Sequence, residues 1–456
     1  MLNDAIHVRR ELMIRAVRAF DEGTLAETLD RIPVALRPKG GAHSRCCVYH
    51  DRAVLKYRLM ALLGFAAEDE SDEAKTLKEY HASAPAPAHP LTVCGAACSR
   101  CPPAQVVVTP NCRGCFARPC QYACPKKAIS VAERSAIDQA KCIKCGRCIA
   151  VCPFHAIVKT TVPCEEACPV GAIRKDESGV AAIDFERCVY CGKCFAACPF
   201  GAVMECSQML EALAALKRGE KIVAMIAPSA QGQFPGTIGQ LISATRKLGF
   251  EDVMEVALGA ELTTAHETEE FLERTAKDPK SLMTSSCCPA YVNLVRKHLP
   301  EFMEHVSETP SPMVFAHRLA KEKHPGAKTL FIGPCVAKRG EAREKGIDYV
   351  LSFEELGAIL AGRKIDVIAC GEDMAERPAA ATARNFAHSC GVTEAVLAEA
   401  SAKIEGFRLD SKSIDGIDKK TLSLLKLHHA GKLSANFLEV MACAGGCCKG
   451  PSSLMR

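Results

Sequence analysis

Residues 284–291, Thr-Ser-Ser-Cys-Cys-Pro-Ala-Tyr, decide how the C-terminal half of the chain is interpreted. Two further cysteine segments follow: GPCVAKRGE at 333–341 and EVMACAGGC at 439–447. Each places a thiol beside proline or small residues, which let the backbone close tightly around an inorganic group. One cysteine pair alone is commonly just a small buried hydrophobic element. Three such segments, one with a lysine three residues after its cysteine, indicate a metal site.

The composition narrows the class of protein. A chain of 456 residues predicts two or three domains. The net charge of +5, from 58 basic and 53 acidic residues, argues against nucleic-acid or membrane-surface binding driven by charge. No run approaches the roughly 18 apolar residues that span a bilayer, and the first residues lack the apolar core of a signal peptide. The 28 cysteines therefore predict reduced, metal-binding thiols in a cytoplasmic protein.

Residues 1–90 are predicted to form a helical N-terminal region and a linker. Apolar residues recur at three- and four-residue steps in ELMIRAVRAF and RAVLKYRLMALLGF. Cys46 and Cys47 fall in the loop between these helices, where spare or structural thiols are expected. The stretch HASAPAPAHP has the composition of a linker and predicts a domain boundary near residue 90. A docking or scaffold module is the expectation for this region.

Residues 91–208 carry cysteines at ferredoxin spacing. Two packets follow C-x2-C-x2-C-x3-C-P, the pattern of bacterial ferredoxins: Cys142, Cys145, Cys148 and Cys152, then Cys188, Cys191, Cys194 and Cys198. A variant with a longer middle spacer comprises Cys112, Cys115, Cys120 and Cys124. Cys164 and Cys168 resemble a degenerate copy. Zinc is the competing metal, but the Cys-Pro ends favour 4Fe–4S clusters in a multi-cluster ferredoxin-type domain.

The spacing also predicts which thiols share a cluster. Three closely spaced cysteines take three corners of one cube, and the remote Cys-Pro takes a corner of the neighbouring cube. Three cubes follow: Cys112, Cys115 and Cys120 with Cys152; Cys142, Cys145 and Cys148 with Cys124; and Cys188, Cys191 and Cys194 with Cys168. A fourth is hypothesised from Cys94, Cys98, Cys101 and Cys198, with Cys164 as the rival ligand. Three or four accessory clusters are therefore expected.

Residues 209–456 alternate between helical and strand patterns. MLEALAALKRG and QLISATRKLGF have helical periodicity, whereas KIVAMIAPS, EDVMEVALG and KTLFIGPC contain short apolar runs typical of buried strands. This alternation predicts parallel α/β sheets with sites at the carboxyl ends of the strands. The cysteine segments fall at such ends.

The three cysteine segments resemble the active-site signature of the iron–iron (FeFe) hydrogenases: TSCCPxW, PCxxKxxE and ExMxCxxxC. The resemblance covers roughly residues 94–450. It implies a ferredoxin-like α+β iron–sulfur region and an α/β catalytic domain of two lobes with the metal site between them. It also implies the reaction 2H⁺ + 2e⁻ ⇌ H₂, with electrons exchanged with ferredoxin or a similar low-potential carrier. Maturation proteins would install a two-iron unit.

The same resemblance implies how the cofactor, the H-cluster, is held. Its 4Fe–4S cubane would be bound by Cys288, Cys335, Cys443 and Cys447. Cys447 would also bridge to a two-iron unit carrying CO, cyanide and a dithiolate. Lys338 would face one cyanide, the backbone at Pro228 and Ser229 the other, and Met441 would lie near the dithiolate.

A proton relay is implied as well, formed by Cys287, Glu267, Glu270, Ser307 and Arg274. Glu267, Glu270 and Arg274 are spaced i, i+3 and i+7, so they share one face of a helix. An alternative for Glu267 is a capping-box partner of Thr264, which has the required spacing.

Several positions depart from the signature, as in the divergent branch often called group B. Tyr291 replaces a tryptophan, Ser285 a threonine, Gly333 a methionine and Met313 a glutamine. One alternative function is an iron–sulfur assembly or sensor protein of the related hydrogenase-like family, without the two-iron unit. A second is a polyferredoxin, which leaves the three C-terminal segments unexplained. The histidines, including His428 and His429, are expected to be surface or packed residues and not ligands.

Overall fold

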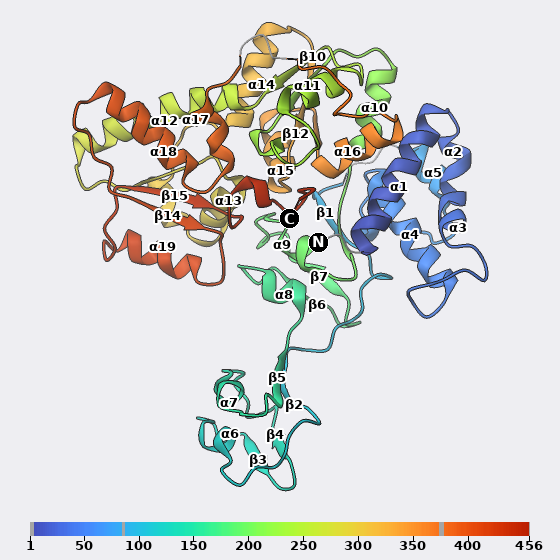
Figure 1. Ribbon diagram of the computed structural model, residues 1–456, viewed down its shortest axis with the longest axis vertical. Helices are drawn as coiled ribbons and strands as arrows, with labels where there is room; N and C mark the ends of the chain where they lie inside the picture. Colours follow the sequence, from blue (N-terminus) through green and yellow to red (C-terminus); the bar gives the residue numbers. More distant parts are fainter. Residues whose placement is uncertain (1–3, 84–86, 374–377, 456) are drawn as a thin grey trace.

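The structure, a computed structural model, describes residues 4–83, 87–373 and 378–455. Figure 1 shows a helical N-terminal region beside a large C-terminal domain, and a cysteine-rich region whose far end projects away from both. Residues 84–86 of the predicted linker lie outside the described residues. Among the residues described, no helix has the length and apolar character needed to cross a membrane.

The N-terminal region is helical, as predicted. Its helices are α1 (Asp4–Asp21), α2 (Leu25–Thr28), α3 (Ile32–Leu36), α4 (Val48–Leu62) and α5 (Leu77–His81). Helix α1 lies against α16 (Phe353–Gly362), where the buried Glu354 carboxylate pairs with Arg9 and Arg10. Leu12 and Val17 of α1 belong to the same hydrophobic core as the strands of the C-terminal domain. The region is therefore part of the scaffold of that domain.

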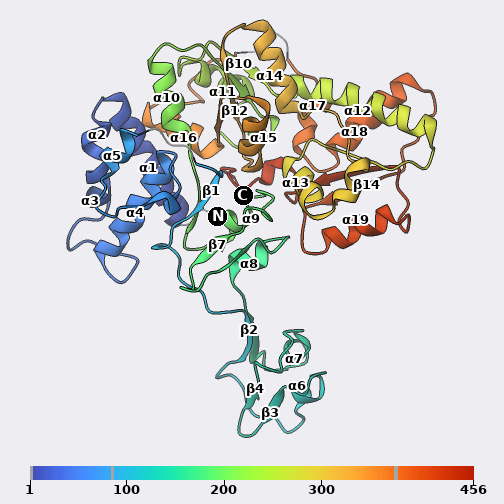
Figure 2. The same cartoon turned by 180° about the vertical axis from the view of Figure 1, so that it is seen from behind.

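The cysteine-rich region contains two units. Residues 105–160 form the projecting one, seen from both sides in Figures 1 and 2. Its elements are β2 (Gln105–Val108), α6 (Pro119–Tyr122), β3 (Ile129–Val131), β4 (Ser135–Ile137), α7 (Arg147–Ala150) and β5 (Ile157–Thr160). Strand β2 pairs antiparallel with β5, and β3 with β4. Its small hydrophobic cluster contains Val106, Ile129 and Ile157 beside two buried cysteines. So small a core needs additional links, which metal clusters would supply.

The second unit, residues 161–205, lies against the C-terminal domain. Its elements are α8 (Pro163–Ala167), β6 (Ile173–Lys175), β7 (Ala181–Ile183), α9 (Lys193–Ala197) and β8 (Val203–Glu205), with β1 (Leu91–Val93) paired antiparallel to β8. Lys297 of the C-terminal domain donates to the carbonyls of Phe185 and Cys188, at 2.8 and 2.9 Å. This unit therefore joins the projecting unit to the large domain.

The C-terminal domain has two parallel sheets, as predicted. The first has the order β10 (Asp252–Glu255), β9 (Ile222–Ile226), β12 (Lys328–Ile332), β13 (Tyr349–Leu351). The second has the order β11 (Met283–Thr284), β15 (Phe437–Met441), β14 (Ser411–Asp415). Strands β9 and β15 are buried along their whole length, which explains the continuous apolar sequence of β9. In β15 the buried Glu439 accepts hydrogen bonds from the backbone N–H groups of Cys390 and Thr393.

Helices cover these sheets. They are α10 (Met209–Lys217), α11 (Ile238–Arg246), α12 (Ala257–Lys277), α13 (Pro289–His298), α14 (Pro312–Lys323), α15 (Ala337–Lys345), α16, α17 (Ala381–Arg384), α18 (Gly391–Lys403) and α19 (Thr421–His429). The helices expected at 209–219 and 240–250 are confirmed as α10 and α11, and the three expected strands as β9, β10 and β12. The two sheets form two lobes, with α12 contacting α14 on one side and α18 on the other.

Candidate active site between the two sheets

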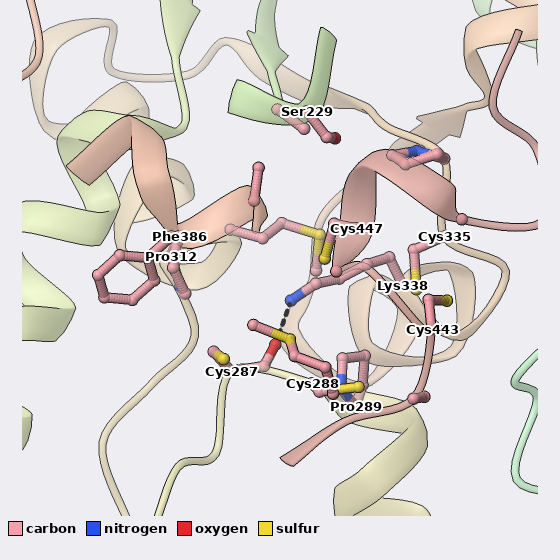
Figure 3. A pocket seen from close by; sticks show the side chains of 18 of the residues that line it. Ser229, Cys287, Cys288, Pro289, Pro312, Cys335, Lys338, Phe386, Cys443 and Cys447 are labelled. Carbon is pink, nitrogen blue, oxygen red and sulfur yellow. Dashed lines mark hydrogen bonds between the residues drawn. The ribbon is translucent and has the colours of Figure 1, made fainter. Parts of the chain in front are cut away.

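A pocket lies between the two lobes, where loops from the carboxyl ends of both sheets meet (Figure 3). The loops after β9, β11, β12 and β15 contribute Ser229, Cys288, Cys335, Cys443 and Cys447 to its lining. Parallel strands bring their carboxyl ends to one edge of a sheet, so segments distant in sequence converge there. The structure thus brings the three predicted cysteine segments together.

The pocket cysteines are close enough to perturb one another. Burial raises the pKa of Cys335 to about 12, and the charge of Cys288 adds to the effect. Burial also raises the pKa values of Cys443 and Cys447, again with contributions from the neighbouring thiols. Four thiolates in an apolar pocket repel one another unless a metal compensates their charge. This donor set fits a 4Fe–4S cubane.

An accessory cysteine reaches the same pocket. Cys191, from the packet at 188–198, is among the lining residues, and its charge contributes to the raised pKa of Cys443. The cysteine spacing predicts that Cys191 belongs to an accessory cluster, but it does not indicate this proximity to the pocket. A cluster held by that packet would therefore lie directly beside the pocket.

Lys338 forms a charged part of the pocket wall. Its Nζ donates to Glu341 Oε2 at 2.6 Å, Ser311 Oγ at 2.9 Å and the Cys287 carbonyl at 3.4 Å, the last drawn as a dashed line in Figure 3. Burial opposes the charge of Lys338, but the carboxylate of Glu341 and the nearby thiols prevail and raise its pKa. The ammonium group therefore stays charged beside the cysteines.

The opposite wall carries a polar group without a partner. Ser229 is 1% exposed, and its Oγ makes no hydrogen bond within the described chain. Figure 3 shows it across the pocket from Cys287 and Cys288. Leaving a buried hydroxyl unpaired costs about 1–3 kcal/mol, so this position favours a ligand that accepts a hydrogen bond. Pro228 and Met441 line the same pocket. The wall therefore fits a two-iron unit with acceptor ligands such as cyanide.

Two departures from the hydrogenase signature have a structural explanation. At Gly333, a Cβ would stand 2.5 and 2.6 Å from two ring atoms of Phe331, so the ring occupies the space of a larger side chain. Phe331 lines the pocket in place of the thioether. Tyr291, which stands where the signature has tryptophan, is fully buried. Its hydroxyl is 2.7 Å from Thr284 Oγ1, so the polar end of the tyrosine has a hydrogen-bond partner.

Glu267 and Cys287 lie close to each other at the wall of the pocket. Cys287 lines the pocket, and burial together with the charge of Glu267 raises its pKa. Glu267 is fully buried, and neither of its carboxylate oxygens makes a hydrogen bond within the described chain. Burial raises its pKa to about 8, and the charge of Glu270 adds to this shift. Glu267 therefore holds a proton at neutral pH.

Glu270 lies at the centre of a hydrogen-bonded group. Its carboxylate accepts from Ser307 Oγ at 2.6 Å, Thr309 Oγ1 at 3.0 Å and Arg274 Nη2 at 2.7 Å. The structure thus brings together the sequence-predicted Glu270, Ser307 and Arg274. The capping-box alternative for Glu267 is wrong, because Thr264 lies inside helix α12 and donates its hydroxyl to the Ala260 carbonyl.

The projecting unit brings its cysteines into two groups. One cavity is lined by Cys112, Cys115, Cys120 and Cys152, the set expected from the corner-swap rule. For the other set, burial and the charges of Cys142 and Cys145 raise the pKa of Cys148, while Cys124 packs on the same small core. Backbone N–H groups donate to Cys124 and Cys152 Sγ, at 3.3 and 3.4 Å. Such donors stabilise thiolate ligands.

The unit at 161–205 contains one clear group of four cysteines and a second group with alternative ligands. Burial and the charges of Cys191, Cys188 and Cys168 raise the pKa of Cys194, so these four thiols lie close together. Cys94, Cys98 and Cys198 share another packing cluster. Burial raises the pKa of Cys164 to about 11, and the charge of Cys198 adds to it, which places the rival thiol near the same site. Cys98 and Cys101 also pack against the core that contains Cys164.

Sequence reasoning missed several groups of the site. Ser311 and Thr309 contact Lys338 and Glu270, respectively, but they belong to a loop whose only sequence signal was the predicted Ser307. Phe331 was hidden because it lies within a strand pattern. A hydroxyl residue at every second position from 307 to 311 is the one local sign that this loop presents a polar face.

Comparisons with known proteins agree with this geometry. The model of the family "Iron only hydrogenase large subunit, C-terminal domain" matches residues 220–451. A 4Fe-4S dicluster domain model matches 161–202, and the LdpA Fe-S cluster-binding domain model matches 110–162. The last two ranges follow the division of the cysteine-rich region into two units.

Three curated relatives are similar to the chain. Iron hydrogenase 1 of Clostridium pasteurianum is 27% identical over 69% of this chain and 64% of its own length. The NADP-reducing hydrogenase subunit HndD of Solidesulfovibrio fructosivorans is 29% identical, over 68% of this chain and 55% of its own. The periplasmic [Fe] hydrogenase large subunit of Nitratidesulfovibrio vulgaris is 30% identical, over 70% and 86%. The chain thus spans less than two thirds of the first two relatives, but most of the third. On the family match and the third relative, it belongs to the iron-only hydrogenase family.

Proposed function

We propose that this protein is an FeFe hydrogenase that catalyses 2H⁺ + 2e⁻ ⇌ H₂. The observation that carries the proposal is the convergence of Cys288, Cys335, Cys443 and Cys447 on one pocket from which Cys287 and a line of acidic groups lead away. An assembly or sensor protein needs the cysteines, but it has no use for a proton route. The alternative without a two-iron unit also leaves the unpaired Ser229 hydroxyl unexplained.

The residues of the pocket would hold and orient the cofactor. The four cysteines would bind the cubane, with Cys447 shared with the two-iron unit. When bound, that unit supplies the redox-active metal and the base between which dihydrogen is cleaved. Lys338, held by Glu341 and Ser311, would direct a positive charge at one cyanide, and Ser229 with the adjacent backbone would donate to the other. Met441 and Phe331 exclude water from the same space.

Protons would move through Cys287 and Glu267 to Glu270. The charge of Glu267 acts on the Cys287 thiol at the pocket wall. Near pH 8 the neutral Glu267 carboxyl can donate a proton and its ionised form can accept one. Ser307 Oγ, which donates to Glu270, can pass a proton by reorienting its hydroxyl. Arg274 holds the Glu270 carboxylate at the outer end.

Electrons would enter through the cysteine-rich region. The cluster of Cys188, Cys191 and Cys194 with Cys168 would be the one nearest the pocket, and two further clusters in the projecting unit would receive electrons from outside. A fourth cluster, from Cys94, Cys98 and Cys101 with Cys198 or its rival Cys164, would lie at the second unit.

The projecting unit offers a surface for the electron carrier. Phe116 and Tyr122 are exposed near its predicted clusters, and exposed basic side chains surround them: Arg113, Arg118, Lys126 and Lys127. Exposed aromatic and basic side chains in one segment favour an acidic protein partner. A ferredoxin or similar low-potential carrier in the cytoplasm has this chemistry, and we assign the same compartment to the maturation proteins. The functional division would be 1–90, 91–208 and 209–456.

Anaerobic maturation followed by a hydrogen assay with a reduced low-potential dye tests the proposal. We expect hydrogen evolution and infrared bands of bound CO and cyanide. Cys287→Ala and Glu270→Ala should remove most turnover while the iron content stays unchanged. Absence of CO and cyanide bands from fully matured protein would favour the assembly or sensor alternative. Near-normal rates in both variants would refute the proton route.

A further inference from the structure

A group of three potential metal ligands lies outside the pocket. Glu304 and His305 end the short 3-10 helix Pro300–His305, and His429 is the last residue of α19. His305 Nε2 is 3.1 Å from His429 Nδ1 and 3.6 Å from Glu304 Oε1, while His429 Nδ1 is 3.8 Å from that same oxygen. Two imidazoles and a carboxylate from two separate elements thus point at one position.

These separations match a coordination sphere. The point equidistant from the three atoms lies about 2.0 Å from each, and zinc binds imidazole nitrogen at about 2.0–2.1 Å and carboxylate oxygen at about 2.0–2.2 Å. An ion slightly outside the plane of the three atoms stays within this range and leaves a position for water. The ligands therefore need almost no movement to bind an ion.

The supporting contacts have the character of a metal site. His305 Nδ1 is 3.3 Å from the Leu282 carbonyl, so that nitrogen carries the proton and Nε2 presents its lone pair. The His305 ring packs edge-on against the fully buried Phe302, with 4.9 Å between ring centroids. The two histidine rings meet at 67° with their centroids 5.3 Å apart. Both rings are thereby held in place before any ion binds.

The group also adjoins the outer end of the proposed proton route. Arg274, which binds Glu270, donates to the carbonyl of Glu304 at 2.8 Å and to that of Val306 at 3.2 Å. The guanidinium is thus held by the residues on either side of His305. An ion bound there adds two positive charges beside the segment that positions Arg274, which disfavours a proton arriving at the same place.

We propose that Glu304, His305 and His429 form a binding site for Zn²⁺ or a similar late transition-metal ion, and that its occupancy slows proton transfer at the outer, Glu270 end of the proposed proton route. Metal binding itself is independent of the catalytic assignment. The effect on proton exchange rests on the proposed hydrogenase function.

Binding is tested on the matured full-length protein under anaerobic conditions. Equilibrium dialysis against micromolar zinc, with metal counted by mass spectrometry, should give about one zinc per chain fewer for His429→Ala and for Glu304→Gln than for the parent. His81→Ala, an exposed histidine on α5, is the matched control and should bind as the parent does. The zinc-edge X-ray absorption spectrum of His429→Ala is subtracted from that of the parent. The difference should show nitrogen and oxygen ligands at about 2.0 Å and no sulfur ligands at about 2.3 Å. Equal zinc content in the parent and the variants would refute the proposed site. Sulfur ligands on the zinc ion that is missing from the variant would refute it as well.

The kinetic effect is measured separately. Each protein's hydrogen evolution rate with zinc is divided by its own zinc-free rate. We expect a several-fold decrease in the parent and in His81→Ala that a chelator reverses, and a much smaller decrease in His429→Ala. Equal inhibition of parent and His429→Ala overturns the effect on proton exchange. A matured protein without any hydrogen turnover refutes the hydrogenase function, and the dialysis result still decides the metal site.

Discussion

Glu267 provides the most direct test of the proton route. Raising its pKa from 4.5 to about 8 corresponds to about 5 kcal/mol in favour of the neutral form, at about 1.36 kcal/mol per pKa unit. At pH 7 the carboxyl is then about 90% protonated, whereas an exposed glutamate is almost fully ionised. Because burial causes most of this shift, it should persist in any state that keeps the pocket closed.

Infrared difference spectroscopy measures this directly. A protonated carboxyl C=O band should disappear as pH rises, with a midpoint near 8, and the band should be absent in Glu267→Gln. The protonated fraction of Glu267 falls roughly tenfold between pH 7 and pH 9. If proton transfer from Glu267 limits turnover, the rate of hydrogen evolution that depends on Glu267 should fall by the same factor. Hydrogen oxidation should change in the opposite direction over the same interval, because it needs the ionised acceptor.

Glu267→Gln keeps the shape and the neutral charge but cannot exchange a proton. It should lower turnover at least about tenfold at every pH, with iron content and CO and cyanide bands unchanged. Glu273→Gln, an exposed glutamate on the same helix, is the control and should keep parental rates. A band that titrates near the ordinary glutamate value of 4.5, or parental turnover in Glu267→Gln, would refute the reasoning.

Three further substitutions test the pocket walls. Ser229→Ala removes the unpaired hydroxyl and should shift a cyanide infrared band and lower turnover a few-fold, about 1 kcal/mol for one hydrogen bond; an unchanged cyanide spectrum would contradict this role. Lys338→Met leaves the Glu341 carboxylate buried without its cation, so the cluster content should drop. Adding Glu341→Gln should restore part of the cluster content. Equal iron content in the parent, Lys338→Met and the double variant would argue against the ion pair. Gly333→Ala forces a methyl group into the Phe331 ring and should lower the thermal midpoint by several degrees, about 1–3 kcal/mol. Gly340→Ala, with no neighbour within 4 Å, should not lower it.

The sequence predicts local features of this protein well. Strands β9 and β12 follow from short apolar runs, because a strand covered on both faces has no polar side. The edge strand β10 follows from a shorter apolar pair, Val253 and Met254, between Asp252 and Glu255. The spacing of Glu267, Glu270 and Arg274 places them on one helix face, since helical geometry needs no tertiary information. Placement of cysteines at the carboxyl ends of strands then follows from the α/β pattern.

Other features depend on contacts between distant segments. Cysteine packets follow one another throughout residues 91–208, so their spacing could not show that the chain forms two units there. Contact of α1 with α16 joins residues that are far apart in the sequence, and nothing local in α1 indicates its partner. Similarly, His429 meets His305 only because α19 and the Pro300–His305 helix pack together. The choice between Cys164 and Cys198 as a ligand of the fourth cluster likewise depends on contacts between distant segments.

The adjacent pair Cys287 and Cys288 explains how the two routes can meet in one pocket without mixing. Successive residues in an extended backbone point to opposite sides, so one thiol can bind a cluster while its neighbour faces Glu267. Lys338 reinforces this arrangement, because its ammonium group donates to the Cys287 carbonyl while its charge acts on Cys335. A single buried cation thus fixes the backbone of the proposed proton carrier relative to the proposed cluster ligands. In the proposed function, electron and proton delivery would therefore depend on the same few contacts, although the electrons would come from the Cys191 side and the protons from α12.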